Sequence, residues 1–154
     1  MRVWRVCLAR HAADAFSGEG GLRHAARWHS KGVRIVYTAA SLSLATLEFF
    51  VNLEPGEPPA LVAISADIPE SVRVELLETE ALPPDWRRIP VPPSSQRIGA
   101  RWVLSNSSAV LPVPSVVIPS ERNCLLNPAH PDFKKIRIGK PEPFSLDQRM
   151  WKVS

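Results

Sequence analysis

The chain has 154 residues, 45% of them hydrophobic and 22% charged, with a formal net charge of +4. This composition is typical of a globular protein with a sizeable core, and we expect residues 1–154 to form a single domain. The basic residues are scattered, without long Lys/Arg runs or interleaved aromatic platforms, which argues against direct nucleic-acid binding. The opening MRVWRVCLAR is too polar for a signal peptide, and no apolar run approaches about 18 residues. We therefore expect a cytoplasmic protein without a membrane segment.

The first third of the chain predicts short elements. Residues 2–7 form the first expected strand, followed by a short helix or turn over 8–15. The sequence SGEGG at 17–21 predicts a flexible loop. The apolar, β-branched run at 33–37 predicts a buried strand.

The clearest helix begins after Ser41, which can cap it, and extends to about Leu53. Most of its circumference is apolar, so we expect protein to cover most of it. Glu48 lies on its one narrow polar stripe, aligned with Ala45 and Asn52. A carboxylate on an otherwise covered helix needs a partner or a wet cleft, so Glu48 is a candidate site residue.

The whole chain has 16 prolines and only 7 glycines, and the prolines lie in the part that follows this helix. We expect strands at 61–68 and 72–77, then a linker at 82–94. A second helix over 95–107 is expected to start from Ser94 as its cap. Its inward-facing residues are expected to be Ile98, Trp102 and Val103.

From Ala109 onward, prolines interrupt every apolar run, and proline is poorly tolerated in central strands. We expect these runs to form edge strands or bends. Cys7 and Cys124 both lie in apolar segments and are expected to be buried free thiols. Together the elements predict an α+β fold with mixed small sheets and flanking helices.

Several common site patterns are missing from the sequence. No metal-binding spacing connects the four histidines, His11, His24, His29 and His130, so we expect no metal site. GEGG at 18–21 lacks the helix that a dinucleotide-binding glycine loop needs, and Ser115 lacks the glycines of a nucleophile elbow. A glycosidase pair would join Glu48 to Asp132 or Asp147, which nothing in the sequence brings together.

Arg27, Tyr37 and Glu48 are open to two interpretations. In the functional one, Arg27 holds an anion, Tyr37 offers a ring or a hydroxyl, and Glu48 stabilises developing positive charge. In the structural one, Arg27 and Glu48 form an ion pair beside a core tyrosine, and spacing alone favours this alternative. Trp28, next to Arg27, could stack on a ligand ring.

Blocks of sequence along nearly the whole chain resemble the RES-domain toxins, a family named for an Arg, a Glu and a Ser. The blocks are VWR at 3–5, AFSGEG at 15–20, RW at 27–28, KG at 31–32, VYTAASLSLATLE at 36–48, WRRIPVPPSSQRIGARW at 86–102, LPVPS at 111–115 and ERNCLLNPAHPDF at 121–133. Their shared order is more specific than any single block, and it favours the functional interpretation.

The resemblance implies an ADP-ribosyltransferase-like fold and a toxin that consumes NAD. Such a toxin cleaves the bond between nicotinamide and ribose, by phosphorolysis to ADP-ribose 1''-phosphate and nicotinamide or by hydrolysis. NAD is then a substrate, inorganic phosphate a co-substrate, and no cofactor is expected. The resemblance also implies an Xre-like antitoxin as protein partner, and a homodimer is a further expectation. The alternatives are ADP-ribosyl transfer to a protein target and a non-catalytic binding module of the same fold.

Carried over by motif, the catalytic residues are Arg27, Tyr37 and Glu48. The residues implied to bind NAD or phosphate are Arg5, Arg27, Trp28, Tyr37 and Ser115.

One departure from the family concerns the loop around Arg27. Where the family commonly has GGRWN, this chain has Ala25 and Ala26 before Arg27, and His29 after Trp28. Because glycine is the more permissive residue, we expect the two alanines to restrict the loop.

Overall fold

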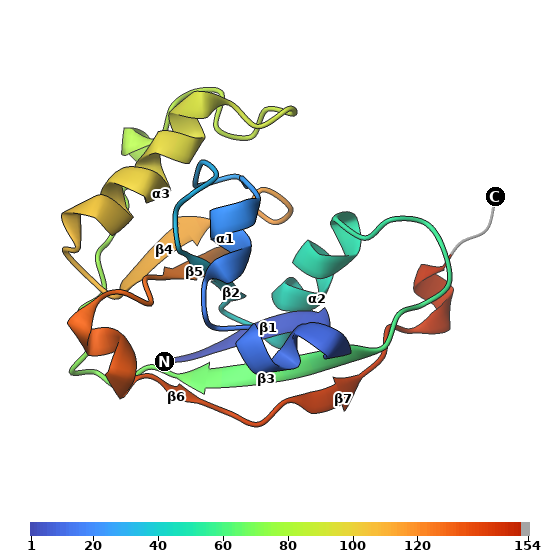
Figure 1. Ribbon diagram of the computed structural model, residues 1–154. Coiled ribbons are helices and arrows are strands. Elements are labelled where there is room, and N and C mark those ends of the chain that lie inside the picture. The colour runs from blue at the N-terminus through green and yellow to red at the C-terminus, as the bar shows by residue number, and fades with distance from the viewer. Residues whose placement is uncertain (152–154) are drawn as a thin grey trace.

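The computed structural model describes residues 1–151, and its strands join in one seven-stranded sheet flanked by helices (Figure 1). The strand order is β4-β5-β2-β1-β3-β6, with β7 also paired to β3, and all strand pairs are antiparallel. The strands are β1 (Arg2–Leu8), β2 (Val36–Ala39), β3 (Leu61–Asp67), β4 (Val110–Pro114), β5 (Arg122–Leu126), β6 (Arg137–Ile138) and β7 (Glu142–Phe144). The α-helices are α1 (Glu19–Arg23), α2 (Leu42–Val51) and α3 (Pro93–Ser105), and short 3-10 helices span Ala9–Asp14, Thr79–Ala81, Pro131–Lys135 and Gln148–Met150. The α+β prediction is confirmed.

The two faces of the sheet carry different cores, because successive strand residues point to opposite faces. We call them the Val36 face and the Tyr37 face, after neighbouring residues of β2. One cluster covers the Val36 face and includes Val3, Cys7, Ile64, Cys124 and Leu126. On the Tyr37 face, α2 packs through Leu44 and Ala45, and α3 packs through Trp102. This arrangement leaves β2 and β5 between the two helices.

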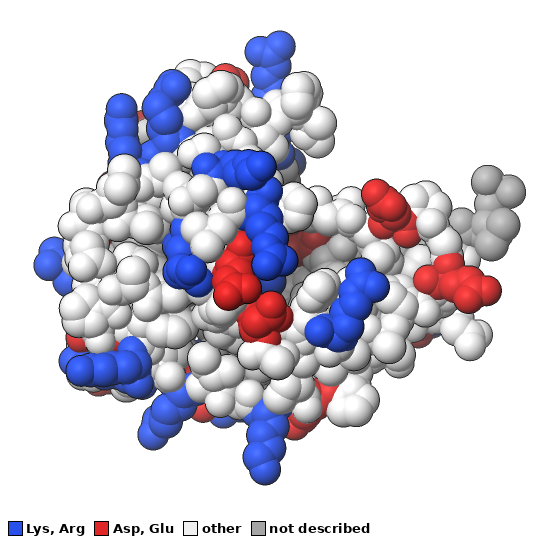
Figure 2. Space-filling view, in the orientation of Figure 1, with Lys and Arg blue, Asp and Glu red and all other residues white. Residues whose placement is uncertain are grey.

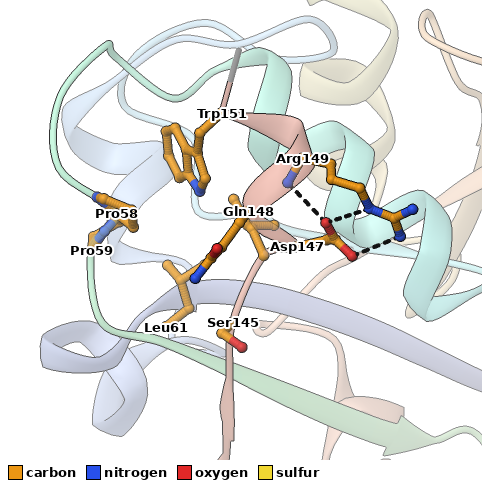
Figure 3. Close-up of a pocket in the computed structure, with 9 residues that line it drawn as sticks. Pro58, Pro59, Leu61, Ser145, Asp147, Gln148, Arg149 and Trp151 are labelled. Atoms are coloured by element: carbon orange, nitrogen blue, oxygen red, sulfur yellow. Dashed lines mark hydrogen bonds and ion pairs between the residues drawn. The ribbon is translucent and has the colours of Figure 1, made fainter. Parts of the chain in front are cut away.

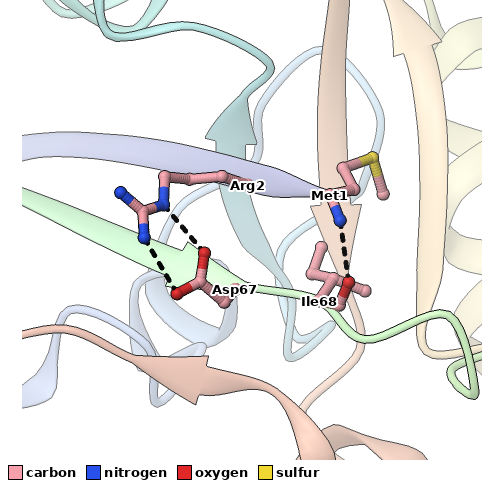
Figure 4. A network of polar contacts seen from close by, with 4 residues as sticks. All are labelled: Met1, Arg2, Asp67 and Ile68. Atoms are coloured by element: carbon pink, nitrogen blue, oxygen red, sulfur yellow. Dashed lines mark hydrogen bonds and ion pairs between the residues drawn. The ribbon is translucent and has the colours of Figure 1, made fainter.

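Strands β1 and β3 form the longest ladder of the sheet. All seven residues of each are paired in register. At one end the Arg2 guanidinium donates two hydrogen bonds to the Asp67 carboxylate, at 2.8 and 3.1 Å, and the Met1 amine donates to the Ile68 carbonyl at 3.0 Å (Figure 4). The ion pair is exposed and contributes little by itself, so the ladder is held mainly by its backbone hydrogen bonds and the core.

Helix α2 begins where the sequence predicts. The Ser41 hydroxyl accepts a hydrogen bond from the Leu44 amide at 3.1 Å, and the helix ends at Val51, slightly before the expected Leu53. Leu44 and Ala45 are buried and six further residues of the helix are partly buried, so protein covers most of it, as expected. Within the helix only Ser43 and Val51 are exposed.

The predicted flexible loop at 17–21 is wrong, because α1 begins there. Gly18 has a φ of 77° just before the helix, and a Cβ atom on Gly21 would overlap the carbonyl oxygen of Val33. The glycines therefore permit close packing rather than disorder. The segment after Val33 packs against α1, so the strand expected at 33–37 starts only at Val36.

The predicted strand at 72–77 is wrong. Only Val74 forms a bridge, with Val110 of β4, and Leu76 is 76% exposed. β4 is an edge strand, as its prolines predict. β5 lies inside the sheet instead, because its nearest proline, Pro128, comes only after the strand has ended.

Helix α3 also starts differently from the prediction. It begins at Pro93, and no side chain caps it. Proline suits the first helical position because its missing N–H is not needed there. The Ser94 hydroxyl instead donates to Asp85 Oδ1 at 3.1 Å. The inward direction of Ile98, Trp102 and Val103 is confirmed.

Candidate functional site

The carboxylate of Glu48 is held from one side only. Ser115 Oγ donates to Glu48 Oε1 at 2.6 Å, and Asn123 Nδ2 donates to the same oxygen at 2.7 Å. Ser115 is fully buried and Asn123 is 8% exposed, whereas Glu48 is partly exposed. No hydrogen bond joins Oε2 to any residue between 1 and 151. The site therefore presents a fixed carboxylate with one oxygen available.

Ser115 is saturated with hydrogen bonds. While it donates to Glu48, its Oγ accepts from the backbone amides of Val117 and Ile118, both at 3.0 Å. A hydroxyl has one donor and two acceptor positions, so all three are used. The structure thus shows Ser115 orienting Glu48 and closing the turn after β4. That Ser115 also binds substrate stays a prediction.

Arg27 and Trp28 occupy a tight turn closed by the Ala26 amide, which donates to the His29 carbonyl at 3.1 Å. The Trp28 ring is 1% exposed and stacks on Trp86, with centroids 6.0 Å apart. A Cβ atom on Gly99 of α3 would overlap the Trp28 carbonyl oxygen, so helix and turn touch through their backbones. Trp28 therefore anchors the turn in the core, and its stacking on a ligand stays a prediction.

The Tyr37 hydroxyl ties this turn to β2. It accepts from the Trp28 amide at 3.1 Å and lies 2.7 Å from His29 Nδ1. His29 Nε2 lies 2.8 Å from the His24 carbonyl, which can only accept. Nε2 therefore carries the proton of the neutral ring, and Tyr37 donates to Nδ1. Burial raises the pKa of Tyr37 far above its ordinary value, so the phenol keeps its proton.

The guanidinium of Arg27 is oriented by the linker before α3. Its Nη1 donates to the carbonyls of Trp86 and Arg88, at 3.1 and 2.6 Å. Burial lowers the pKa of Arg27, while the negative charge of Glu48 opposes that shift. Arg27 and Glu48 thus feel each other's field, yet no ion pair joins them among the described residues. The structural alternative of a direct Arg–Glu pair is not formed.

Arg5 lies in different surroundings from Arg27. The unbroken β1–β3 register places it on the Val36 face with Val3 and Cys7. Its Nη1 donates to the backbone carbonyl of Tyr37 at 2.8 Å, and its buried Nε has no partner within residues 1–151. The structure does not join Arg5 to Glu48, so its role in binding the substrate stays a prediction.

The alanine pair before Arg27 imposes no backbone strain. In residues 1–151, positive φ angles occur only at Gly18, Gly32, Gly56 and Asn106. Ala25 and Ala26 therefore adopt backbone angles open to any residue. That these alanines restrict the conformational freedom of the loop stays a prediction.

The two aspartates considered as partners of Glu48 lie elsewhere. Asp132 pairs with Lys135 at 3.0 Å, and Asp147 pairs with Arg149 at 3.0 Å (Figure 3). Figure 3 shows Asp147 at the edge of a pocket of about 600 Å³, which is lined by Pro58, Pro59, Leu61, residues 145–149 and Trp151. None of the predicted site residues lines this pocket, and the two-carboxylate hypothesis gains no support.

Two parts of the site were missed by sequence reasoning. Asn123 is the second donor to Glu48, and its signal was a polar amide at the start of the apolar strand β5. The linker carbonyls that orient Arg27 could not be predicted from the sequence, because every residue has a backbone carbonyl. Figure 2 shows that the viewed face of the molecule is hollowed between the α3 and α2 regions, with acidic and basic side chains beside the hollow.

Comparisons with known proteins find relatives of this chain along nearly its whole length. A family model described as the RES domain matches residues 2–147. A Sphingobium protein named Prs ADP-ribosylating toxin is 39% identical over 152 residues, covering 96% of this chain and 94% of its own length. A Photorhabdus laumondii protein named Toxin Res is 37% identical over 156 residues, covering 99% of each chain.

The fold is similar to one in the crystal structure of the M. tuberculosis MbcT-MbcA toxin-antitoxin complex. The TM-score is 0.73 and the alignment covers 94% of this chain and 84% of the other, at 16% identity, which shows the fold alone. Within residues 1–151, no helix is long and apolar enough to cross a membrane. Because the family model matches residues 2–147, almost the whole chain, the chain belongs to the RES domain family.

Proposed function

We propose that this protein is the toxin of a toxin–antitoxin system and cleaves the bond between nicotinamide and ribose in NAD. The observation that carries this proposal is the Glu48 carboxylate, held through one oxygen by Ser115 and Asn123 with Oε2 free of partners among the described residues. It lies in the field of Arg27 without pairing with it. The Glu48 carboxylate and the Arg27 guanidinium suit NAD, because its phosphates are anionic and its ribose becomes cationic as the bond to nicotinamide breaks.

The reaction needs such an arrangement. As the bond to nicotinamide breaks, its electron pair stays on the ring nitrogen, and positive charge develops on the ribose carbon. A carboxylate such as Glu48 stabilises that charge. In phosphorolysis, an oxygen of inorganic phosphate forms the new bond to this carbon, giving ADP-ribose 1''-phosphate and neutral nicotinamide. Arg27 binds phosphate oxygens, either of the dinucleotide or of the attacking phosphate.

Tyr37 and Trp28 support the turn that carries Arg27. The Tyr37 hydroxyl is engaged by the Trp28 amide and by His29, so we propose that Tyr37 acts mainly by positioning the turn and offering its ring edge. Nicotinamide departs as a neutral molecule, so the reaction needs little proton transfer. This fits a site in which the phenol is held protonated by burial.

Transfer of ADP-ribose to a protein is the second candidate function. One observation favours it: the relative at 39% identity bears the name Prs ADP-ribosylating toxin. The same carboxylate would stabilise the same cation, and only the acceptor would differ. A non-catalytic module that keeps the fold is the third candidate.

The decisive experiment incubates the purified protein with NAD, with and without inorganic phosphate, and measures nicotinamide and the ADP-ribose products. We expect nicotinamide release with a phosphorylated product that requires phosphate. Free ADP-ribose without phosphate would indicate hydrolysis, and a labelled protein band without free product would indicate transfer. No NAD loss under any of these conditions, nor after a cell lysate is added as a source of acceptor proteins, would leave only the binding module.

Glu48→Gln provides the matched test of the residue. It keeps the shape and one accepting oxygen, but it removes the charge and replaces the other oxygen by an NH2 donor, so we expect the rate to fall by about 1000-fold. Glu57→Gln, an exposed glutamate in the loop after α2, removes the same charge away from the site and serves as control. Equal activity of both variants would contradict the role of Glu48.

We also propose an antitoxin as the protein partner and the cytoplasm, where NAD is available, as the place of action. The solved complex with a similar fold is a toxin–antitoxin complex, which supports a partner of this kind. Its Xre-like character and a homodimer of the toxin are expectations. Co-expression with the product of a neighbouring helix-turn-helix gene should restore growth and give a complex on size-exclusion chromatography.

A further inference from the structure

One buried polar atom of the site is left incomplete. Asn123 lies on β5, in register with Ala39 of β2 and Val113 of β4. The residue is 8% exposed, and its Oδ1 is buried without a hydrogen-bond partner in residues 1–151. Buried side-chain oxygens are nearly always paired in native proteins. This oxygen therefore needs a donor that the described chain does not supply.

The direction of the amide follows from its neighbour. An ionised carboxylate only accepts hydrogen bonds, so Asn123 must turn Nδ2 toward Glu48. The contact between Nδ2 and Glu48 Oε1 measures 2.7 Å. Oδ1 is the neighbouring atom of the same planar group and is left to accept from elsewhere. The clamp on Glu48 thus fixes an acceptor next to the carboxylate.

Glu48 itself has a second available acceptor. Ser115 and Asn123 both bond to Oε1, and no bond to Oε2 occurs among the described residues. Oε2 and the Asn123 Oδ1 are therefore two acceptors held by one network. Two neighbouring acceptors match the two hydroxyls of a vicinal diol, which are adjacent donors.

We propose that Asn123 is a substrate-binding residue whose Oδ1 accepts a hydrogen bond from a hydroxyl of the ribose attached to nicotinamide. This inference rests on the proposed function, which brings that ribose to Glu48. The carbon that becomes cationic is bonded directly to a hydroxyl-bearing carbon, so a ribose stabilised by Glu48 brings a hydroxyl within reach of the same amide. The carboxamide of nicotinamide is the competing donor, but it departs with the ring.

The test compares substrates and variants in one cycle. Wild type and Asn123→Ala are each assayed for nicotinamide release from NAD and from its 2''-deoxy and 3''-deoxy analogues. We expect Asn123→Ala to lower the preference for NAD over one deoxy analogue by about tenfold in kcat/KM, as expected for one hydrogen bond. The intrinsic reactivity of each analogue cancels, because it is the same for both proteins. A purely structural role in holding Glu48 would slow all substrates equally and overturn the inference.

Two further variants separate the loss of the proposed hydrogen bond from a general disturbance of the fold. Asn123→Asp keeps an oxygen in place of Oδ1 but loses the donor to Glu48, so we expect a lower rate with the preference for NAD retained. Asn127→Ala removes another buried asparagine, whose Nδ2 donates to Asn106 Oδ1 at 3.1 Å, and should leave the preference unchanged. A preference that shifts as much in Asn127→Ala as in Asn123→Ala would contradict the assignment.

The remaining outcomes are also decisive. The 3-acetylpyridine analogue of NAD lacks the carboxamide N–H, and a preference altered only with this analogue would overturn the ribose contact. Failure of wild type to release nicotinamide from NAD would overturn the proposed function and this inference together. Normal release with an unchanged preference in Asn123→Ala would overturn the inference alone.

Discussion

Arg27 and Arg5 lie near the same strand, β2, but in unlike surroundings. Arg27 is oriented by linker carbonyls, and the charge of Glu48 raises its pKa against the effect of burial. Arg5 lies on the Val36 face, with its charge near Cys7 and Asp14, and donates to the backbone of β2. The comparison teaches that the position of an arginine in a sequence motif does not show whether it binds the substrate or stabilises the sheet. What a guanidinium can bind depends on which side of the sheet it lies.

Among the variants that test this comparison of the two arginines, Arg27→Lys is expected to have the largest effect. Lysine keeps the charge but loses the planar guanidinium, which engages two carbonyls and which we propose to bind a phosphate as well. We expect kcat/KM for NAD to fall by about 100-fold, with little change in the free energy of unfolding. Steady-state kinetics and thermal unfolding check this. Arg101→Lys, on the exposed side of α3, is the control, and equal activity of both variants would place Arg27 outside the binding site.

Ser115→Ala should come next. Glu48 then loses one of its two donors, and the amides of Val117 and Ile118 lose their acceptor. We expect kcat to fall by about tenfold and the free energy of unfolding by about 1–3 kcal/mol. A rise in KM with kcat unchanged would instead support the prediction that Ser115 binds the substrate directly.

Arg5→Met separates bracing from binding. The Tyr37 carbonyl loses its donor, so we expect the free energy of unfolding to fall by about 1–3 kcal/mol. The KM for NAD of the folded variant should stay near the wild-type value, as measured at a temperature well below its unfolding midpoint. A KM raised as much as in Arg27→Lys would mean that Arg5 binds the substrate too, and that the two arginines do not differ in role.

The smallest effect concerns pH. Burial lowers the pKa of His29 below its ordinary value of 6.5, so below that pH the unfolded chain takes up the proton more readily than the folded one. The stability from neutral His29 is complete above about pH 6.5 and is lost as the pH falls through the lower folded pKa. Denaturant unfolding measured across this pH window should show that the free energy of unfolding falls more steeply with falling pH in the wild type than in His29→Asn. Identical slopes would mean that the Tyr37–His29 contact does not depend on the neutral ring.

Local patterns predicted the elements that rest on local physics. The Ser41 cap, the inward stripe of α3 and the burial of Cys7 and Cys124 all follow from spacing and hydrophobicity, and the structure confirms them. The strand at 72–77 failed because alternation alone does not provide a pairing partner. The loop at 17–21 failed because its glycines serve close packing of α1, which local sequence does not reveal.

The candidate site was found only in part. The sequence pointed to Arg27, Tyr37 and Glu48. The charge of Glu48 affects the pKa of Arg27, but the joint role of the three residues in catalysis stays a prediction. The sequence did not single out Asn123, which is 75 positions from Glu48 and reaches it only because β5 pairs with β2 inside the sheet. Nor did it show that the Tyr37 hydroxyl is already engaged by Trp28 and His29.

The sequence by itself determined the family, the α+β class and the residue types of the chemistry, because motif blocks and periodicity are local properties of the chain. The tertiary structure decided which of those side chains meet. Strand alternation put Arg5 on the other face of the sheet from Tyr37, and sheet order brought Asn123 beside α2. The reason is physical, since a contact between distant residues depends on pairing and packing energies summed over the whole fold.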